Sequence, residues 1–307
     1  MVVLVTGANG QLGQALQKIA KTHSDIRFVL TDSKTLDITD KENCERIFKE
    51  LKPDFCINTA AYTAVDKAES EADSAHKINV SGVENLAESC KKYHTTLIHI
   101  STDFVFDGEK NIPYTENDKP NPKSIYGKTK FEGEQVIQSL LENYYIIRTS
   151  WLYSEFGNNF YKTMLRLGSE KEFLNVVNDQ IGTPTNANCL AKVIIEVVRC
   201  QMSDVGSLKA EEKIPTPNTQ HLTPDTRHPY GIYNFSNEGN CSWYDFAKKI
   251  FELHNIQITL NPIPTSSYPT AAIRPKYSVL DKTKIKTVFG IKIKPWEEGL
   301  GDLRFEI

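Results

Sequence analysis

Several features of exported and membrane-bound proteins are missing from this sequence of 307 residues. It has no run of about 18 consecutive apolar residues, which excludes an ordinary membrane-spanning helix. Residues 1–6 lack the basic stretch that opens a secretion signal, and they lead directly into a glycine-rich motif. We therefore expect a cytoplasmic protein that has no membrane partner.

The spacings typical of metal sites and disulfide frameworks are also missing. The six cysteines are scattered and include no CxxC pair, and the seven histidines are dispersed. Free thiols in a reducing compartment are the simplest interpretation. We predict no bound metal.

A strong charge of either sign is absent as well. The formal net charge is −3, so nothing in the composition favours a polyanionic partner, and we expect no nucleic acid to bind. Hydrophobic residues make up 39% of the chain. That content and the length suffice for one large α/β domain or two smaller ones.

What is present begins with a glycine motif at the N-terminus. An apolar run at 2–6 is followed by Gly7, Gly10 and Gly13 and then by a helical pattern. Glycines let the backbone turn tightly and approach a pyrophosphate, while the helix N-terminus offers N–H groups and a partial positive charge. A strand, a glycine-rich turn and a helix in this order predict a dinucleotide site.

Asp32 ends the second predicted strand, about 20 residues beyond the glycines. A carboxylate there can accept a hydrogen bond from a ribose 2′-hydroxyl and repels a 2′-phosphate. It therefore favours NADH over NADPH, although NADPH stays open. The alternative is a strand-end turn aspartate. Asp37 and Ile38 follow at positions that could flank the adenine.

Strand and helix patterns alternate through the first half of the chain. The further apolar runs lie at 53–58, 96–101 and 144–150. Alternation of this kind predicts an α/β fold with a doubly wound parallel sheet of the Rossmann type. Ligands of such sheets bind at the carboxyl ends of the strands.

The rhythm changes after residue 150. We expect a dinucleotide-binding domain over 1–150 and a smaller, mainly sugar-nucleotide-binding domain over 151–307. Segments near 172–200 and 231–236 are candidates to pack back on the Rossmann sheet. A helix is predicted from Ala187 to about Arg199.

The stretch 203–230 is polar and rich in proline and threonine, which predicts a long, mobile surface loop. A linker between domains is the alternative for this stretch.

Three residues around the fourth strand suggest the chemistry. Thr102 follows an apolar strand, and Tyr126 and Lys130 stand four residues apart at the start of a predicted helix, on one helix face. A nearby ammonium lowers the pKa of a phenol, and a hydroxyl can orient a substrate oxygen. The set suits delivery of a proton to a carbonyl oxygen while hydride arrives from elsewhere. An ordinary amphipathic helix start is the alternative for the Tyr-Lys pair.

The chain resembles the extended short-chain dehydrogenase/reductase superfamily and, within it, the dTDP-4-dehydrorhamnose reductases. The likeness runs nearly end to end. The segments that carry it are 7–13, 36–40, 58–69, 101–108, 126–130, 148–153, 179–184 and Arg274-Pro275. The glycines and the YxxxK pair are shared by the whole superfamily, whereas Ala64–Glu69 and Arg148–Trp151 are more specific.

The resemblance implies roles for individual residues. It makes Tyr126 the proton donor to the C4 carbonyl of a nucleotide-linked 4-keto-6-deoxyhexose. It makes Lys130 the partner of the nicotinamide ribose, and Thr102 the group that orients the carbonyl. The residues expected to bind cofactor are Gly7, Gly10, Gln11, Leu12, Asp32, Asp37, Ile38, Ala60, Ala61, Tyr62, Thr63, Ile100, Tyr126 and Lys130. Those expected to bind substrate are Thr102, Asp103, Trp151 and Arg274.

Two positions depart from the pattern of these relatives. Many relatives have tyrosine where this chain has Phe104, so a contact through that hydroxyl is lost. Some relatives dimerise around a magnesium ion held partly by a glutamate where this chain has Ala15. A metal-bridged dimer is therefore not expected, and a monomer and a homodimer both stay open.

Three functions are compatible with these features. The first is an NAD(P)H-dependent 4-reductase that forms dTDP-L-rhamnose or its UDP equivalent. The second is a bifunctional 3,5-epimerase/4-reductase, for which the sequence indicates no further acid/base pair. The third is a non-catalytic nucleotide-binding regulatory subunit, resembling the one associated with methionine adenosyltransferase. The intact Thr102, Tyr126 and Lys130 favour an enzyme.

Overall fold

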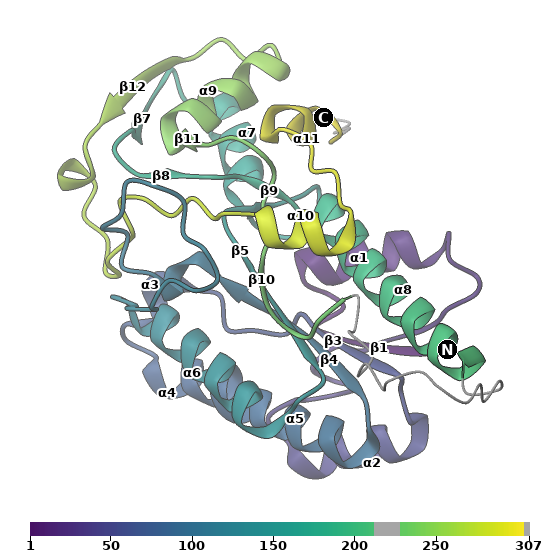
Figure 1. The fold of residues 1–307 in the computed structure, drawn as a ribbon. Coiled ribbons are helices and arrows are strands. Elements are labelled where there is room, and N and C mark those ends of the chain that lie inside the picture. Colours follow the sequence, from purple (N-terminus) through teal and green to yellow (C-terminus); the bar gives the residue numbers. More distant parts are fainter. Residues whose placement is uncertain (212–227, 304–307) are drawn as a thin grey trace.

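The computed structural model describes residues 1–211 and 228–303 (Figure 1). The strands are β1 (Val2–Thr6), β2 (Arg27–Leu30), β3 (Phe55–Asn58), β4 (Thr96–Thr102), β5 (Tyr144–Thr149), β6 (Leu152–Tyr153), β7 (Phe173–Val177), β8 (Ile181–Gly182), β9 (Thr185–Asn186), β10 (Gly231–Asn234), β11 (Cys241–Ser242) and β12 (Thr259–Ile263). The α-helices are α1 (Gln11–Ala20), α2 (Lys41–Leu51), α3 (Val65–Ala68), α4 (Ala72–His76), α5 (Gly82–Tyr93), α6 (Ile125–Leu140), α7 (Phe160–Glu170), α8 (Ala187–Glu211), α9 (Trp243–Leu253), α10 (Thr283–Phe289) and α11 (Trp296–Gly301). A π-helical turn, η1 (Lys77–Ser81), and two 3₁₀ turns, η2 (Asp103–Val105) and η3 (Thr265–Ser267), complete the elements.

The centre of the molecule is a six-stranded parallel sheet with the order β10-β5-β4-β3-β1-β2. Its middle strands are buried along almost their whole length, because helices cover both faces. The strand order reverses between β1 and β3, which makes a switch point there. The predicted doubly wound α/β sheet is confirmed.

Two apolar layers hold the helices on the sheet. On one face α2, α5 and α6 pack side by side over a core that includes Phe48, Leu86 and Ile146. On the other face α1 packs against α8 over Val5, Leu16 and Ile194. Figure 1 shows these two helical layers on either side of the strands. The carboxyl ends of the strands are thus left for a ligand.

A third apolar core lies among α7, α9 and α11, at the top of Figure 1. Here β7 pairs with β12 rather than with the central sheet. Between these elements, α8 returns to pack on α1, and β10 becomes the edge strand beside β5. The division into domains at residue 150 stays a prediction.

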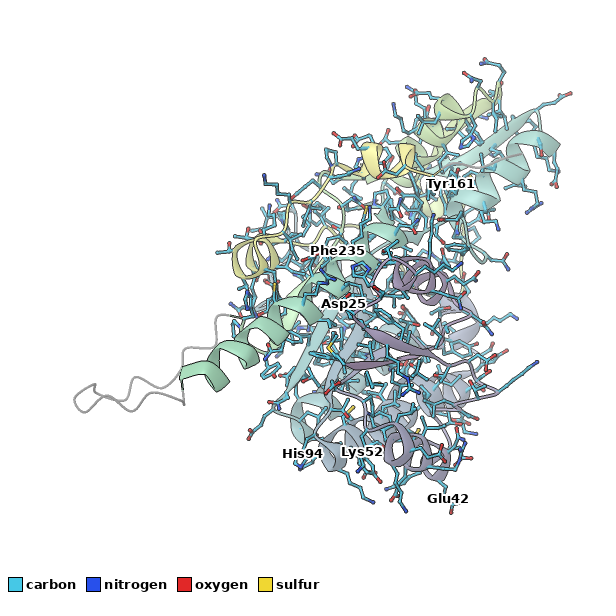
Figure 2. The ribbon with its side chains drawn as sticks, turned by 90° about the vertical axis from the view of Figure 1, so that its right-hand side faces the viewer. Asp25, Glu42, Lys52, His94, Tyr161 and Phe235 are labelled. Carbon is cyan, nitrogen blue, oxygen red and sulfur yellow. The ribbon has the colours of Figure 1, made fainter. Side chains whose placement is uncertain are left out.

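Helix α8 is longer than the sequence pattern indicated. We predicted a helix to about Arg199 and a loop over 203–230, but α8 continues to Glu211. No proline occurs between Ala187 and Pro215, so the sequence contains no residue that would break the helix at Arg199. The end of α8 projects from the rest of the chain in Figure 2. The remainder of that predicted loop, 212–227, lies outside the described residues.

Candidate active site

The glycine turn lies at the switch point of the sheet, after β1. Gly7 has φ of +68°, and a Cβ atom there would lie 2.6 Å from the backbone nitrogen of Ala60, which follows β3. A Cβ atom on Gly13 would lie 2.4 Å from the carbonyl oxygen of Gly7. Only glycine fits these close approaches without moving the backbone. In this turn the backbone itself, without side chains in between, therefore lies at the carboxyl ends of β1 and β3, where the strand order reverses.

Helix α1 opens from this turn with no side-chain cap. Gly10 is its N-cap residue, and no side chain accepts a hydrogen bond from the first N–H groups. Uncapped N–H groups and the positive end of the helix dipole suit a phosphate. The residues present thus fit the pyrophosphate of a dinucleotide.

Asp32 lies where the sequence pattern placed it, after β2 and beside the glycine turn. Its carboxylate accepts hydrogen bonds from Asn9 Nδ2 at 2.9 Å and from the backbone nitrogens of Lys34 and Thr35. The hydrogen bonds from Thr35, above all, hold the pKa of Asp32 below its usual value. Asp32 is therefore ionised at neutral pH, as recognition of a ribose hydroxyl requires.

Of the two residues predicted to flank the adenine, Asp37 has an exposed side chain and Ile38 a buried one. Asp37 is exposed, and its Oδ1 accepts hydrogen bonds from the backbone and hydroxyl of Thr39. The Ile38 side chain is buried in the core, close enough to Gly82 to leave no room for a Cβ atom there. That side chain anchors α5 to the loop after β2, and the place of Ile38 beside an adenine stays a prediction.

The segment after β3 is held in place by Asn79, a residue that the sequence pattern did not assign to the site. Asn79 Oδ1 accepts from the backbone nitrogen of Tyr62, and its Nδ2 donates to the Tyr62 carbonyl and to Thr129 Oγ1. Asn79 belongs to η1, a π-helical turn between α4 and α5. The only signal in the sequence was an asparagine among apolar positions.

Gln11 joins the glycine turn to the C-terminal half. Its Oε1 accepts hydrogen bonds from Ser154 Oγ at 3.1 Å and from Asn159 Nδ2 at 2.9 Å. The amide oxygen of this predicted cofactor residue thus already has two partners within the protein. Leu12 is buried in the core below the turn. Any contact of Leu12 with a cofactor is therefore left to its backbone N–H group.

Thr102 ends β4 and Asp103 begins η2, at the same edge of the sheet. The Thr102 hydroxyl donates to Asp103 Oδ1 at 3.0 Å and accepts from the backbone nitrogen of Phe104. Both side chains are buried, and Asp103 Oδ2 has no hydrogen-bond partner among the described residues. Burial raises the pKa of Asp103 to about 6. A buried acceptor without a donor is what a sugar hydroxyl would satisfy.

Tyr126 stands in the first turn of α6, which Ser124 caps by accepting from the Gly127 nitrogen. The Phe104 ring packs edge-on against the phenol ring, with centroids 5.5 Å apart. Burial raises the pKa of Tyr126 to about 12, although hydrogen bonding to Thr102 opposes the shift. We predicted a pKa lowered by Lys130; in this structure the desolvation of the phenol outweighs any such effect.

Lys130 lies one turn further along α6 and is buried. Its Nζ donates to the carbonyl oxygen of Ile100 at 2.7 Å and lies 3.1 Å from His99 Nε2. Burial lowers the pKa of Lys130 to about 8, and the charge of Glu134 opposes this shift. The lysine is therefore held against β4, close to the predicted cofactor contact at Ile100.

Trp151 and Arg274 have protein partners in this structure. The Trp151 ring stacks on Trp243 with centroids 3.6 Å apart. The Arg274 guanidinium binds Asp66 at both oxygens, at 3.0 and 2.6 Å. No contact in the structure tests their predicted roles toward substrate.

The specific motif Ala64–Glu69 has a clear structural role. Asp66 holds Arg274, while Glu69 Oε1 accepts from the backbone nitrogen of Ile125 at 2.8 Å. One short helix, α3, thus ties the Arg274 loop to the start of the helix that carries Tyr126. In the described part of the chain no group of His, Cys, Asp or Glu residues is arranged to hold a metal ion. No helix there has the length and apolar character to cross a membrane.

A parallel sheet with a glycine turn at its switch point, and a Thr-Tyr-Lys set at the neighbouring strand end, define the short-chain dehydrogenase/reductase class. The family model described as RmlD substrate binding domain matches residues 1–306. The chain belongs to this family.

Named relatives agree with this assignment. A dTDP-4-dehydrorhamnose reductase of Aggregatibacter actinomycetemcomitans is 42% identical over 309 aligned residues, covering 98% of each chain. A crystal structure of a dTDP-4-dehydrorhamnose reductase from Clostridium acetobutylicum superposes with a TM-score of 0.86, at 42% identity over 98% of each chain. The Bacillus anthracis dTDP-4-dehydrorhamnose reductase in complex with NADP has a TM-score of 0.84 at 40% identity, covering 97% of this chain and 96% of that one.

Proposed function

We propose that this protein reduces the C4 keto group of a nucleotide-linked 4-keto-6-deoxyhexose, converting dTDP-4-dehydrorhamnose, or its UDP equivalent, to the L-rhamnose product. One observation carries the proposal. β4 and α6 bring Thr102, Tyr126 and Lys130 to the strand edge that also bears the glycine turn. The names of relatives that align over nearly the full length support the substrate class.

The chemistry assigned to the protein is proton delivery. A bound dinucleotide supplies the hydride that adds to C4. Tyr126 transfers its phenolic proton to the carbonyl oxygen, so that the C=O group becomes a CH–OH group. With a pKa of about 12, the Tyr126 phenol carries its proton throughout the neutral range. Thr102 positions the same oxygen by a hydrogen bond.

The cofactor is NADH or NADPH. The ionised Asp32 beside the glycine turn favours NADH, because a carboxylate repels a 2′-phosphate. A relative 40% identical to this chain was crystallised with NADP. We therefore propose that both dinucleotides bind, with Asp32 as the residue that sets the ratio of their affinities.

Substrate contacts are assigned to Asp103, Trp151 and Arg274. Asp103 Oδ2 offers an acceptor to a sugar hydroxyl. Arg274 reaches a diphosphate only by exchanging its bidentate contact with Asp66 for one with phosphate. Trp151 presents its ring to substrate from the stack with Trp243.

The remaining assignments concern the whole chain. We propose a dinucleotide-binding domain over 1–150 and a mainly sugar-nucleotide-binding domain over 151–307. We place the enzyme in the cytoplasm, as a monomer or homodimer. The six free cysteines support a reducing compartment.

Tyr126→Phe tests the proposal directly. We expect turnover to fall by about 10²–10⁴-fold, because the proton donor is removed. Cofactor binding should be kept, since the ring still packs on Phe104. The measurement is oxidation of NADH or NADPH with the 4-keto sugar nucleotide, beside fluorescence titration of the cofactor. Tyr93→Phe, on α5 and far along the chain from the site, is the matched control.

The same assay separates the alternative functions. Each mixture is run with and without a separate 3,5-epimerase, on dTDP- and UDP-4-keto-6-deoxyglucose. Oxidation only with the epimerase indicates a dedicated 4-reductase, and oxidation without it indicates a bifunctional enzyme. Cofactor binding without oxidation in any mixture would contradict catalysis and favour the regulatory subunit.

A further inference from the structure

A buried line of polar side chains runs from β3 through β4 to Lys130 on α6. Asn58 Nδ2 lies 3.0 Å from His99 Nδ1, and His99 Nε2 lies 3.1 Å from Lys130 Nζ. Asn58 and His99 are 1% and 0% exposed, so bulk water does not reach them. Polar groups in this position must satisfy each other.

The orientation of the Asn58 amide is set by a backbone donor. Its Oδ1 accepts from the backbone nitrogen of Ala60 at 3.1 Å and from the hydroxyl of Thr6 at 2.6 Å. A backbone N–H can only donate, so the atom that faces Ala60 is the oxygen. The Nδ2 group of Asn58 therefore faces His99.

This orientation selects one tautomer of His99. Nδ2 of Asn58 donates, so His99 Nδ1 accepts and carries no proton. A neutral imidazole then has its proton on Nε2, which faces Lys130. Burial drives the pKa of His99 well below its usual value, and the charge of Lys130 acts in the same direction. Both effects keep the ring neutral.

A donor on His99 Nε2 needs an acceptor on Lys130. An ammonium has three N–H donors and no lone pair, whereas a neutral amine has one lone pair. The amine can accept from His99 while it donates to the carbonyl oxygen of Ile100. We propose that His99, fixed as its Nε2–H tautomer by Asn58, is a positioning residue that favours the neutral amine of Lys130 over its ammonium and so lets Lys130 lose its proton at a lower pH.

The charges around Lys130 are consistent with this assignment. Glu134, one turn along α6, favours the ammonium, but both its oxygens are engaged by Arg148 on β5. From the β4 side, the neutral His99 faces the amine, and Asp103 and Tyr126 lie at the substrate edge. Burial is the largest influence on the lysine and brings its pKa to about 8.

The consequence rests on the proposed reductase function. Reduction of a ketone consumes one proton with the hydride, and the phenolate left on Tyr126 is stabilised by an ammonium at Lys130. Protonation of Lys130 in its present place would set an N–H of Lys130 against the N–H of His99. Proton uptake by Lys130 is therefore coupled to a change at its contact with His99.

The tautomer can be measured without any catalysis. Long-range ¹H–¹⁵N spectra of ¹⁵N-histidine-labelled protein distinguish Nε2–H from Nδ1–H rings. We expect one histidine to be Nε2–H and to show no titration between about pH 5 and 8. Its resonance should be missing in His99→Gln. An Nδ1–H ring at His99, or a ring that titrates in this range, overturns the proposal, whether or not the protein proves to be a reductase.

The pH profile tests the effect on Lys130. We expect the kcat/KM of the wild type to fall above about pH 8, as Lys130 loses its proton. In His99→Gln, the amide oxygen can face the lysine and accept from the ammonium. That variant should move the basic limb up by about one pH unit.

A second variant changes the tautomer while keeping the imidazole. In Asn58→Asp, both oxygens accept, so His99 must donate from Nδ1 and offer a lone pair to Lys130. Asn58→Asp should also move the basic limb of the kcat/KM profile to higher pH, and it should convert the His99 signal to that of an Nδ1–H ring. Thr6→Val is the control, because Ala60 still orients Asn58 without the hydroxyl. An unmoved basic limb in a folded His99→Gln or Asn58→Asp protein refutes the role.

Discussion

The side chain of Asp103 shows how a single residue can oppose the stability of the fold. Its carboxyl is 2% exposed, and burial raises its pKa to about 6 from an ordinary value of 3.8. The folded protein therefore binds more protons than the unfolded chain between about pH 4 and 6. Its stability falls as pH rises through this window and stays lower above it. The unpartnered Oδ2 of Asp103 thus lowers the stability of the fold. Such a loss is expected of an acceptor that serves to bind substrate.

Asp103→Asn should therefore stabilise the protein in a pH-dependent way. Removing the buried charge should raise the free energy of unfolding by about 3 kcal/mol at pH 7.5 but only by about 1 kcal/mol at pH 4.5. Urea denaturation at the two pH values measures the difference. The amide nitrogen that the substitution introduces has no hydrogen-bond partner, and this lowers the gain in unfolding free energy by the same amount at both pH values. A variant effect that does not change with pH would show that Asp103 is not desolvated.

At the scale of elements, one ion pair joins α6 to β5. Arg148 donates from Nε and Nη2 to the two oxygens of Glu134, at 2.9 and 2.6 Å, and both side chains are almost wholly buried. The guanidinium also lies over the ring of Phe106, 5.1 Å from its centroid. The pair fixes the helix that carries Tyr126 and Lys130 against the sheet.

Arg148→Met should destabilise the fold by about 3–5 kcal/mol, because it leaves the Glu134 carboxylate buried and unpaired. Arg148→Met combined with Glu134→Leu should recover a large part of the loss. The exposed pair Arg166 and Glu170 on α7, at a similar distance, is the matched control. Arg166→Ala should cost less than about 0.5 kcal/mol. Equal losses for the two arginines in urea denaturation would contradict this account.

At the scale of the whole molecule, the predicted cofactor site draws on both halves of the chain. Gln11 at the glycine turn binds Ser154 and Asn159, and α8 covers α1. A ligand at the switch point should therefore stabilise the folded chain as a whole.

Binding of a dinucleotide should raise the Tm. At a concentration of about 100 times Kd, the gain is about 2.7 kcal/mol, which for a chain of this length corresponds to roughly 4 °C. At equal concentrations we expect a larger rise with NADH than with NADPH, and a smaller gap in Asp32→Ala. Thermal unfolding of the wild type and Tyr126→Phe should show the same rise. No rise with either dinucleotide would argue against the site.

Local patterns predicted much of this protein. The strand-glycine-helix order at residues 2–20, the acid at Asp32 and the four-residue spacing of Tyr126 and Lys130 are short-range features. Backbone and side-chain periodicity act over the same short range, so the amino-acid order alone is enough to recognise these features. The burial of the Ile38 side chain is not a short-range feature, because it depends on Gly82, far along the chain.

The sequence by itself determined the class of sheet, the place of the glycine turn and the identity of the Thr-Tyr-Lys set. Only the tertiary structure decided their electrostatic state. Burial raises the pKa of Tyr126 and lowers that of Lys130, and the partner of Lys130 is His99 on β4. Desolvation and hydrogen-bond direction depend on every element packed around a group, and no spacing along one segment encodes them.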